Sequence, residues 1–137
     1  MNAKEIVPGL WQSPLAFVLQ EWPTLKDQVD VVVLMAELIE GVPGDVPFVY
    51  FPIPDDPSGC DAIEQVRLLA EMVGRFRVLT ICHMGENRSG LLSALILIYQ
   101  GVLPEEAVRL VQTRGPTTSD PDRGSFWNPG FVQQVLA

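Results

Sequence analysis

Metal-ligating residues are scarce in this sequence of 137 residues, which contains one histidine and two cysteines. Such a set does not make a zinc cluster, and two cysteines cannot make a disulfide framework. We therefore expect neither a metal nor a cofactor. In a reducing compartment both cysteines would remain thiols.

Positive charge and long apolar runs are also lacking. There are 9 Lys and Arg against 17 Asp and Glu, a net charge of −8, whereas a protein that binds nucleic acid or anionic lipid needs a basic face. The longest apolar run, residues 91–99, is interrupted by Ser93 and is far shorter than the ~20 residues of a membrane span. A secretory signal is not expected, since Pro8 interrupts the start of the chain. We expect a cytoplasmic monomer that binds neither nucleic acid nor membrane.

The remaining composition is that of a globular protein. Apolar residues make up 47% of the chain and charged residues 19%, and the length suits one domain over residues 1–137. Predicted strands alternate with predicted helices, which is typical of an α/β fold with a mostly parallel central sheet flanked by helices. The predicted strands are LWQS from Leu10, the β-branched run Val31–Leu34, FVYFPI from Phe48 and RFRVLTI from Arg75.

Four segments predict helices, because their apolar residues recur at helical spacing or their ends carry helix signals. Pro104 is typical of a first helical residue, and Gly74 and Gly101 are typical of helix ends. The polar segment 114–130 predicts a long loop. The predicted helices run from Asp61 to Gly74, over residues 89–100, from Pro104 onward and from about Phe131.

The stretch TICHMGENRSG, residues 80–90, joins a predicted strand to a predicted helix. Ligands of α/β sheets gather at such junctions, where loop N–H groups and a helix N-terminus attract anions. Gly85 allows backbone angles closed to other residues, and Arg88 can hold two oxygens of a phosphate. The loop therefore has the features of a phosphate-binding site.

The same groups would stabilise a thiolate at Cys82, and only a thiolate is an effective nucleophile. Ser89 can donate a hydrogen bond to that sulfur when it must leave. A buried, inert cysteine at a strand end is the alternative. The combination of Cys82 with Gly85, Arg88, Ser89 and Gly90 favours the nucleophile.

This pattern, Cys-x-x-Gly-x-x-Arg-Ser-Gly, resembles the signature of cysteine-based protein tyrosine phosphatases, and within them the compact dual-specificity-like group. IVPGLWQS, VVVLM and GVLPEEAVRLVQTRG are similar to other segments of that group. The resemblance implies a dual-specificity-phosphatase-like fold and hydrolysis of a phosphorylated protein or a small aryl or alkyl phosphate. It implies a phosphocysteine on Cys82 and phosphate binding by the loop residues His83, Met84, Gly85, Glu86, Asn87 and Arg88.

A departing alkoxide or phenoxide needs a proton, so a carboxylic acid must approach the loop. The resemblance places this acid on a separate loop upstream of the cysteine. YFPIPDDPSG is similar to the family there and implies Asp55 as the general acid and base, with Asp56 as the alternative.

The sequence departs from the family at Ile81, where most members have a histidine that orders the loop and activates the thiol. A module that binds phosphate without turnover is therefore one alternative function. A rhodanese-like sulfurtransferase is another, although Ser89 and the upstream aspartates favour the phosphatase. Glu86 is acidic where lipid-phosphatase relatives are basic, which argues against highly charged substrates. We expect His83 at the mouth of the pocket.

Two further groups of residues have alternative roles. Cys60 is expected to be a structural thiol, with a protective disulfide to Cys82 as the alternative. Trp11, Trp22 and Trp127 are expected to pack in the core, with a substrate-stacking ring among them as the alternative. The segment TTSDPDRGSFWNPG could flank the site or be inert surface.

Overall fold

The protein is described by a computed structural model, in which five strands form one sheet in the order β1-β2-β5-β3-β4. Strand β1 is antiparallel to β2, and the other three pairings are parallel. The predicted α/β fold with a mostly parallel sheet is thus confirmed. The strands are β1 (Lys4–Val7), β2 (Leu10–Pro14), β3 (Val31–Leu34), β4 (Phe48–Tyr50) and β5 (Val78–Cys82). The structure describes residues 2–35, 47–50, 70–71, 73, 75–117 and 124–136.

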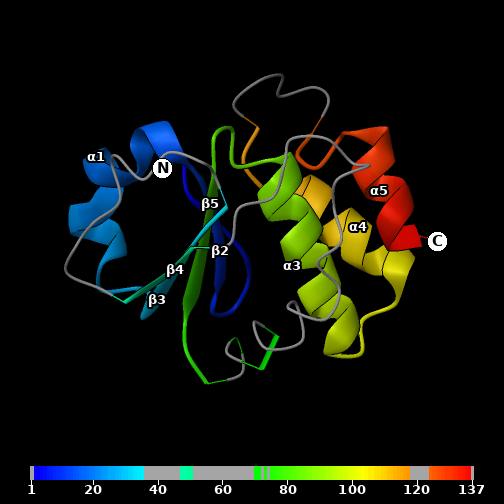
Figure 1. The fold of residues 1–137 in the computed structure, drawn as a ribbon, viewed down its shortest axis with the longest axis horizontal. Coiled ribbons are helices and arrows are strands. Elements are labelled where there is room, and N and C mark those ends of the chain that lie inside the picture. The colour runs from blue at the N-terminus through cyan, green and yellow to red at the C-terminus, as the bar shows by residue number, and fades with distance from the viewer. Residues whose placement is uncertain are drawn as a thin grey trace.

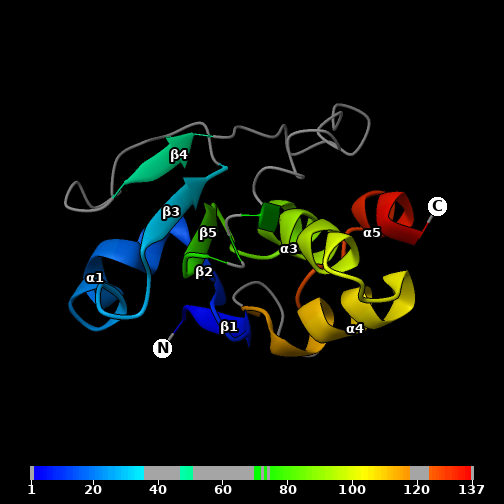
Figure 2. The same cartoon turned by 90° about the horizontal axis from the view of Figure 1, so that it is seen from below.

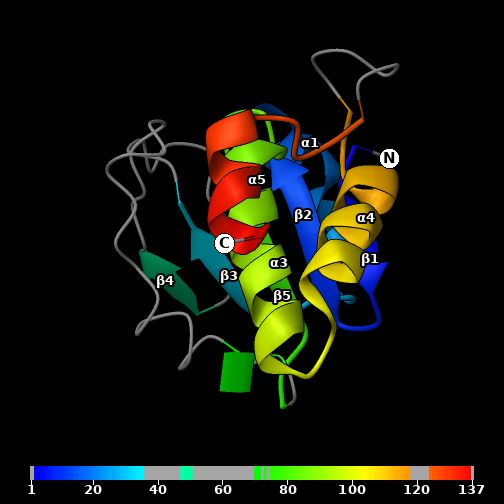
Figure 3. The same ribbon diagram turned by 90° about the vertical axis from the view of Figure 1, so that its right-hand side faces the viewer.

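Helices cover both faces of this sheet. Helix α1 lies on one face, and α3, α4 and α5 lie on the other (Figure 1), which is clearest when the sheet is seen from below (Figure 2). Figure 3 shows α5 in front of α3, with α4 beside them; α3 lies against the central strands β2 and β5, and α4 lies against β1. The described helices are α1 (Leu15–Leu25), α3 (Asn87–Tyr99), α4 (Pro104–Arg114) and α5 (Pro129–Leu136).

The central strand β5 is buried on both faces and divides the core in two. Leu79 and Ile81 pack in a cluster with Trp22 of α1. Val78 and Cys82 pack in the cluster that contains the buried side chains of α3, α4 and α5. Because successive side chains of a strand point to opposite faces, this alternation places Cys82 on the same face as α3.

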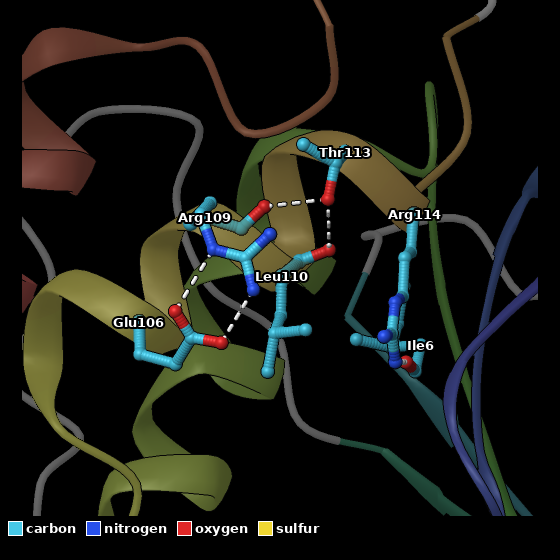
Figure 4. A network of polar contacts seen from close by, with 6 residues as sticks. All are labelled: Ile6, Glu106, Arg109, Leu110, Thr113 and Arg114. Carbon is cyan, nitrogen blue, oxygen red and sulfur yellow. Dashed lines mark hydrogen bonds and ion pairs between the residues drawn. The ribbon is translucent and has the colours of Figure 1, made fainter.

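Helix α4 is tied to the edge strand β1 at its C-terminal end. The Arg114 guanidinium donates a 2.9 Å hydrogen bond from Nη1 to the carbonyl oxygen of Ile6 (Figure 4). On the exposed side of α4, Arg109 donates two hydrogen bonds to the carboxyl of Glu106. These bonds hold the pKa of Glu106 below its ordinary value.

Most predicted elements are found, with shifted ends. Strand β5 begins at Val78 rather than Arg75, and α3 begins at Asn87 rather than Ser89. Helix α4 begins at Pro104 as predicted, whereas the predicted loop 114–130 is shorter, since α5 already starts at Pro129. Most of the helix predicted from Asp61, and the end of FVYFPI, lie outside the described residues.

Strand β1 and helix α1 were not predicted. Helix α1 follows β2 without a loop and contains Pro23, a residue that usually breaks helices. Its buried residues Val18, Trp22 and Leu25 have helical spacing, which is the signal in the sequence that could have revealed it.

Candidate active site

A pocket of about 130 Å³ opens over the loop between β5 and α3. One water needs roughly 10–15 Å³, so the pocket has room for a larger ligand group. Cys82 and Arg88 are 2% and 5% exposed and form its base, whereas His83 and Met84 are exposed at its mouth. The lining residues are Cys82, His83, Met84, Asn87, Arg88, Trp127 and Asn128.

The pocket lies where an anion is favoured. Cys82 is the last residue of β5, and α3 begins at Asn87, so the helix N-terminus is adjacent to the pocket. Helix N-termini carry partial positive charge and free N–H groups. Buried Arg88 adds a full positive charge on the same side.

The structure places some of the predicted loop residues in the pocket and others behind it. Gly85, Glu86 and Ser89 are buried and do not line the pocket. Within the described part of the chain, the Ser89 hydroxyl oxygen has no hydrogen-bond partner. Because Glu86 is buried and does not line the pocket, its side chain does not reach the pocket mouth. His83 is exposed there, as expected.

Strand β2 supports the loop from behind. Gly85 has a φ of +70°, and a Cβ at this position would lie 2.5 Å from the backbone nitrogen of Pro14. The fully buried side chain of Gln12 donates a 3.0 Å hydrogen bond from Nε2 to the carbonyl oxygen of Gly85. Glycine is needed here by both backbone angle and space. Gln12 was not identified from the sequence.

The segment before α5 forms one wall of the pocket. The Trp127 indole donates a 3.1 Å hydrogen bond from Nε1 to Oε2 of Glu86. The backbone N–H of Asn128 donates a 2.9 Å hydrogen bond to Oδ1 of Asn87. The sequence left open whether TTSDPDRGSFWNPG flanks the site or is inert surface. Its residues Trp127 and Asn128 flank the site. Asn128 is a pocket residue that sequence reasoning did not identify, whereas Trp127 was one of three tryptophans named there as an alternative substrate-stacking ring.

Asn128 also fixes the start of α5. Its Oδ1 accepts a 3.0 Å hydrogen bond from the backbone N–H of Gly130, as a helix-capping asparagine does. An asparagine directly before a predicted helix was a signal for this cap. Nearby, a Cβ on Gly90 would lie 2.7 Å from the Phe126 ring. Gly90 therefore allows this segment to pack closely against α3.

Ile81 is buried in the apolar cluster on the α1 side of the sheet. It thus points away from the face that carries Cys82. Trp22 is 8% exposed in the same cluster, and Trp11 packs against it. The prediction of core packing is confirmed for these two tryptophans, whereas Trp127 lines the pocket.

Three residues singled out in the sequence lie outside the described residues. They are the two acid candidates, Asp55 and Asp56, and the second cysteine, Cys60. Among the residues that the structure does describe, no three His, Cys, Asp or Glu side chains are grouped so that they could bind a metal. In this same part of the chain no helix is long and apolar enough to cross a membrane.

No protein-family model and no curated protein matches the sequence. Solved structures do match its fold. Human DUSP28 has a TM-score of 0.78 and 19% identity over 99% of this chain and 91% of its own. A human tyrosine phosphatase-like serine/threonine/tyrosine-interacting protein has a TM-score of 0.74 and 20% identity over 98% and 93%. P. aeruginosa TpbA has a TM-score of 0.70 and 22% identity over 99% and 84%, and TpbA was also solved in complex with phosphotyrosine. The chain therefore has the compact fold of the dual-specificity phosphatases.

Proposed function

We propose that this protein is a cysteine-dependent phosphomonoester hydrolase of the dual-specificity type. Its substrate would be a phosphorylated protein or a small aryl or alkyl phosphate. The observation that carries the proposal is the position of Cys82, buried at the base of a pocket that it shares with Arg88 at a strand-to-helix junction. A nucleophile beneath an anion-binding loop is the arrangement that phosphoryl transfer to sulfur requires.

In the first step the Cys82 thiolate attacks phosphorus in line with the departing oxygen. The S–P bond forms and the P–O bond to the leaving group breaks. Arg88 and the N–H groups of the loop stabilise the negative charge on the other phosphate oxygens. Asp55 gives its proton to the leaving oxygen, and Asp56 is the alternative donor.

In the second step water attacks the phosphocysteine. The same aspartate, now ionised, accepts a proton from that water while the P–S bond breaks. The Ser89 hydroxyl donates a hydrogen bond to the departing Cys82 sulfur. Inorganic phosphate leaves, and the starting thiolate is restored without a metal or a cofactor.

The fold and the charge distribution support further parts of this proposal. The fold is shared with dual-specificity phosphatases, and TpbA binds phosphotyrosine in its solved complex. The net charge of −8 agrees with a cytoplasmic protein that binds neither nucleic acid nor an anionic membrane. We propose that residues 1–137 act as one phosphatase domain and as a monomer.

Hydrolysis of an aryl phosphate by the wild type and by Cys82→Ser tests the proposal. We expect the variant to lose activity to background and vanadate to inhibit the wild type, with no effect of chelators. Asp55→Ala should lower kcat by about 100-fold or more, as loss of a general acid does. The same loss in Asp56→Ala, with Asp55→Ala unaffected, would exchange the roles of the two aspartates. Equal rates for wild type and Cys82→Ser would refute the mechanism.

Phosphate recognition without turnover is a second candidate function. Two observations favour it. Ile81 replaces the histidine that activates the thiol in most of the family, and it is buried on the opposite face from Cys82. The fold is also shared with a human phosphatase-like interacting protein. In that case the wild type would bind phosphate or vanadate but hydrolyse no aryl phosphate. Asp55→Ala and Asp56→Ala would then leave binding unchanged.

A further inference from the structure

The Trp127 ring is held at the pocket in a defined orientation. Its indole nitrogen donates to Oε2 of Glu86 at 3.1 Å, and the neighbouring Asn128 N–H donates to Oδ1 of Asn87 at 2.9 Å. Two contacts to successive residues of the loop and α3 therefore tie this wall to the phosphate-binding loop. A ring bonded along one edge keeps its face in one direction, which favours recognition of a flat ligand.

Glu86 is the residue that anchors this ring. It is fully buried, directly follows Gly85 and does not line the pocket. A buried polar side chain is costly unless it is hydrogen-bonded, so its bond to Trp127 has a structural consequence. The side chain of Glu86 fixes the wall of the pocket and does not itself line it.

Beside His83, the lining of the pocket offers an apolar and an aromatic side chain, Met84 and Trp127. Met84 is 46% exposed there, and Arg88 is the one Lys or Arg among the described lining residues. A methionine sulfur and an indole both make favourable contacts with an aromatic ring. The pocket thus suits a ligand with one phosphate group at the base and one aromatic ring beside Met84 and Trp127.

We propose that Trp127 is a specificity-determining residue that stacks on the aromatic ring of an aryl phosphate, and that Glu86 is its positioning residue. The preferred substrates are then aryl monophosphates, such as phosphotyrosine side chains, over alkyl monophosphates. This inference rests on the proposed function for phosphate binding by the loop but not for turnover.

Binding to the Cys82→Ser protein tests the inference separately from hydrolysis. Phenyl phosphate and cyclohexyl phosphate are similar in size and charge, but only the first has an aromatic ring. We expect phenyl phosphate to bind about 2- to 10-fold more tightly in calorimetry, the range of one aromatic pair. Trp127→Leu, which keeps an apolar side chain, should abolish this ratio with little change for cyclohexyl phosphate. Trp127→Phe should keep part of it.

The role of Glu86 is tested by two further variants in the same protein. Glu86→Gln keeps an oxygen that can accept the indole N–H and should keep the ratio, whereas Glu86→Ala should reduce it although Trp127 is present. Leu103→Ala removes a side chain that is 71% exposed beyond the far end of α3, and it is the matched control. Thermal melts identify any variant that fails to fold.

Each outcome is decisive. Equal affinity of the two esters, binding of neither ester, or an unchanged ratio in Trp127→Leu would overturn the role of Trp127. An unchanged ratio in Glu86→Ala would overturn the positioning role. A ratio that depends on Trp127, in a wild type that hydrolyses no ester, would support the inference and refute the proposed hydrolase.

Discussion

The side-chain amide of Gln12 is hydrogen-bonded to the carbonyl oxygen of Gly85 at 3.0 Å, although the two residues are 73 positions apart. The bond connects β2 to the back of the loop between β5 and α3. It occupies the Gly85 carbonyl on the buried side of the loop. Strand β2 therefore supports the loop, whose pocket is on the other side.

Gln12→Ala should weaken phosphate binding without removing any group that touches phosphate. The Gly85 carbonyl would lose a buried hydrogen bond, which costs about 1–3 kcal/mol, so we expect a lower Tm and an affinity for inorganic phosphate reduced about 5- to 100-fold. Calorimetry and thermal melts measure both. Gln28→Ala, at an exposed position, is the control. An unchanged affinity in Gln12→Ala would show that the loop keeps its shape without β2.

Gly85→Ala and Gly101→Ala separate steric clash from backbone strain. Both glycines have positive φ, but a Cβ on Gly85 meets the backbone of Pro14 at 2.5 Å, whereas a Cβ on Gly101 has nothing within 4 Å. Left-handed backbone costs an alanine about 1–2 kcal/mol, so both variants should melt earlier. Only Gly85→Ala should also lose hydrolysis, by about 100-fold, since the loop must move. Equal hydrolysis rates in the two variants would contradict this.

Ser89→Ala distinguishes a catalytic hydroxyl from a structural one. The Ser89 and Ser93 hydroxyls are both buried and lack a partner within the described residues, so removing either relieves an unsatisfied polar group and should not lower the Tm. If Ser89 assists the departing Cys82 sulfur, its alanine variant accumulates phosphocysteine and kcat falls by about tenfold or more. Burst kinetics with an aryl phosphate measure this. Ser93→Ala should behave as wild type, and similar kinetics for both variants would exclude the proposed role.

Asp30→Asn should make the stability of the fold less dependent on pH. The side chain of Arg77 donates two hydrogen bonds, of 3.1 and 3.0 Å, to the Asp30 carboxyl, and they hold the pKa of Asp30 below its ordinary value. The contribution of this pair is present above the pKa of Asp30 in the unfolded chain and is lost as pH falls through the lower folded value. The Tm difference between wild type and variant should therefore shrink on acidification.

Thermal melts from about pH 7 to about pH 2, across the ordinary aspartate range, measure that difference. Asp27→Asn is the control, because it removes a neighbouring carboxyl but keeps the Asp27 carbonyl that accepts from Arg77. A Tm difference that is constant with pH would show that the pair does not contribute through charge.

Local sequence patterns were sufficient for the elements that hold the candidate nucleophile. The run Val31–Leu34 is the buried strand β3 that it predicts, and the predicted strand RFRVLTI contains most of the buried strand β5. Pro104 is the first residue of α4, because its missing N–H costs nothing there. Helix α1 was missed since Pro23 is usually a helix breaker, and here the packing of Val18, Trp22 and Leu25 outweighs that tendency.

The sequence by itself determined the fold class and the proposed chemistry of the loop, because the alternation of strands and helices and the spacing of Cys82, Gly85 and Arg88 are local properties. The tertiary structure alone decided which distant side chains support the loop and line the pocket. Gln12 and Trp127 reach the loop only through the pairing of β2 with β5 and the docking of the segment before α5 on α3. Such contacts depend on strand order and packing, which no spacing along the chain encodes.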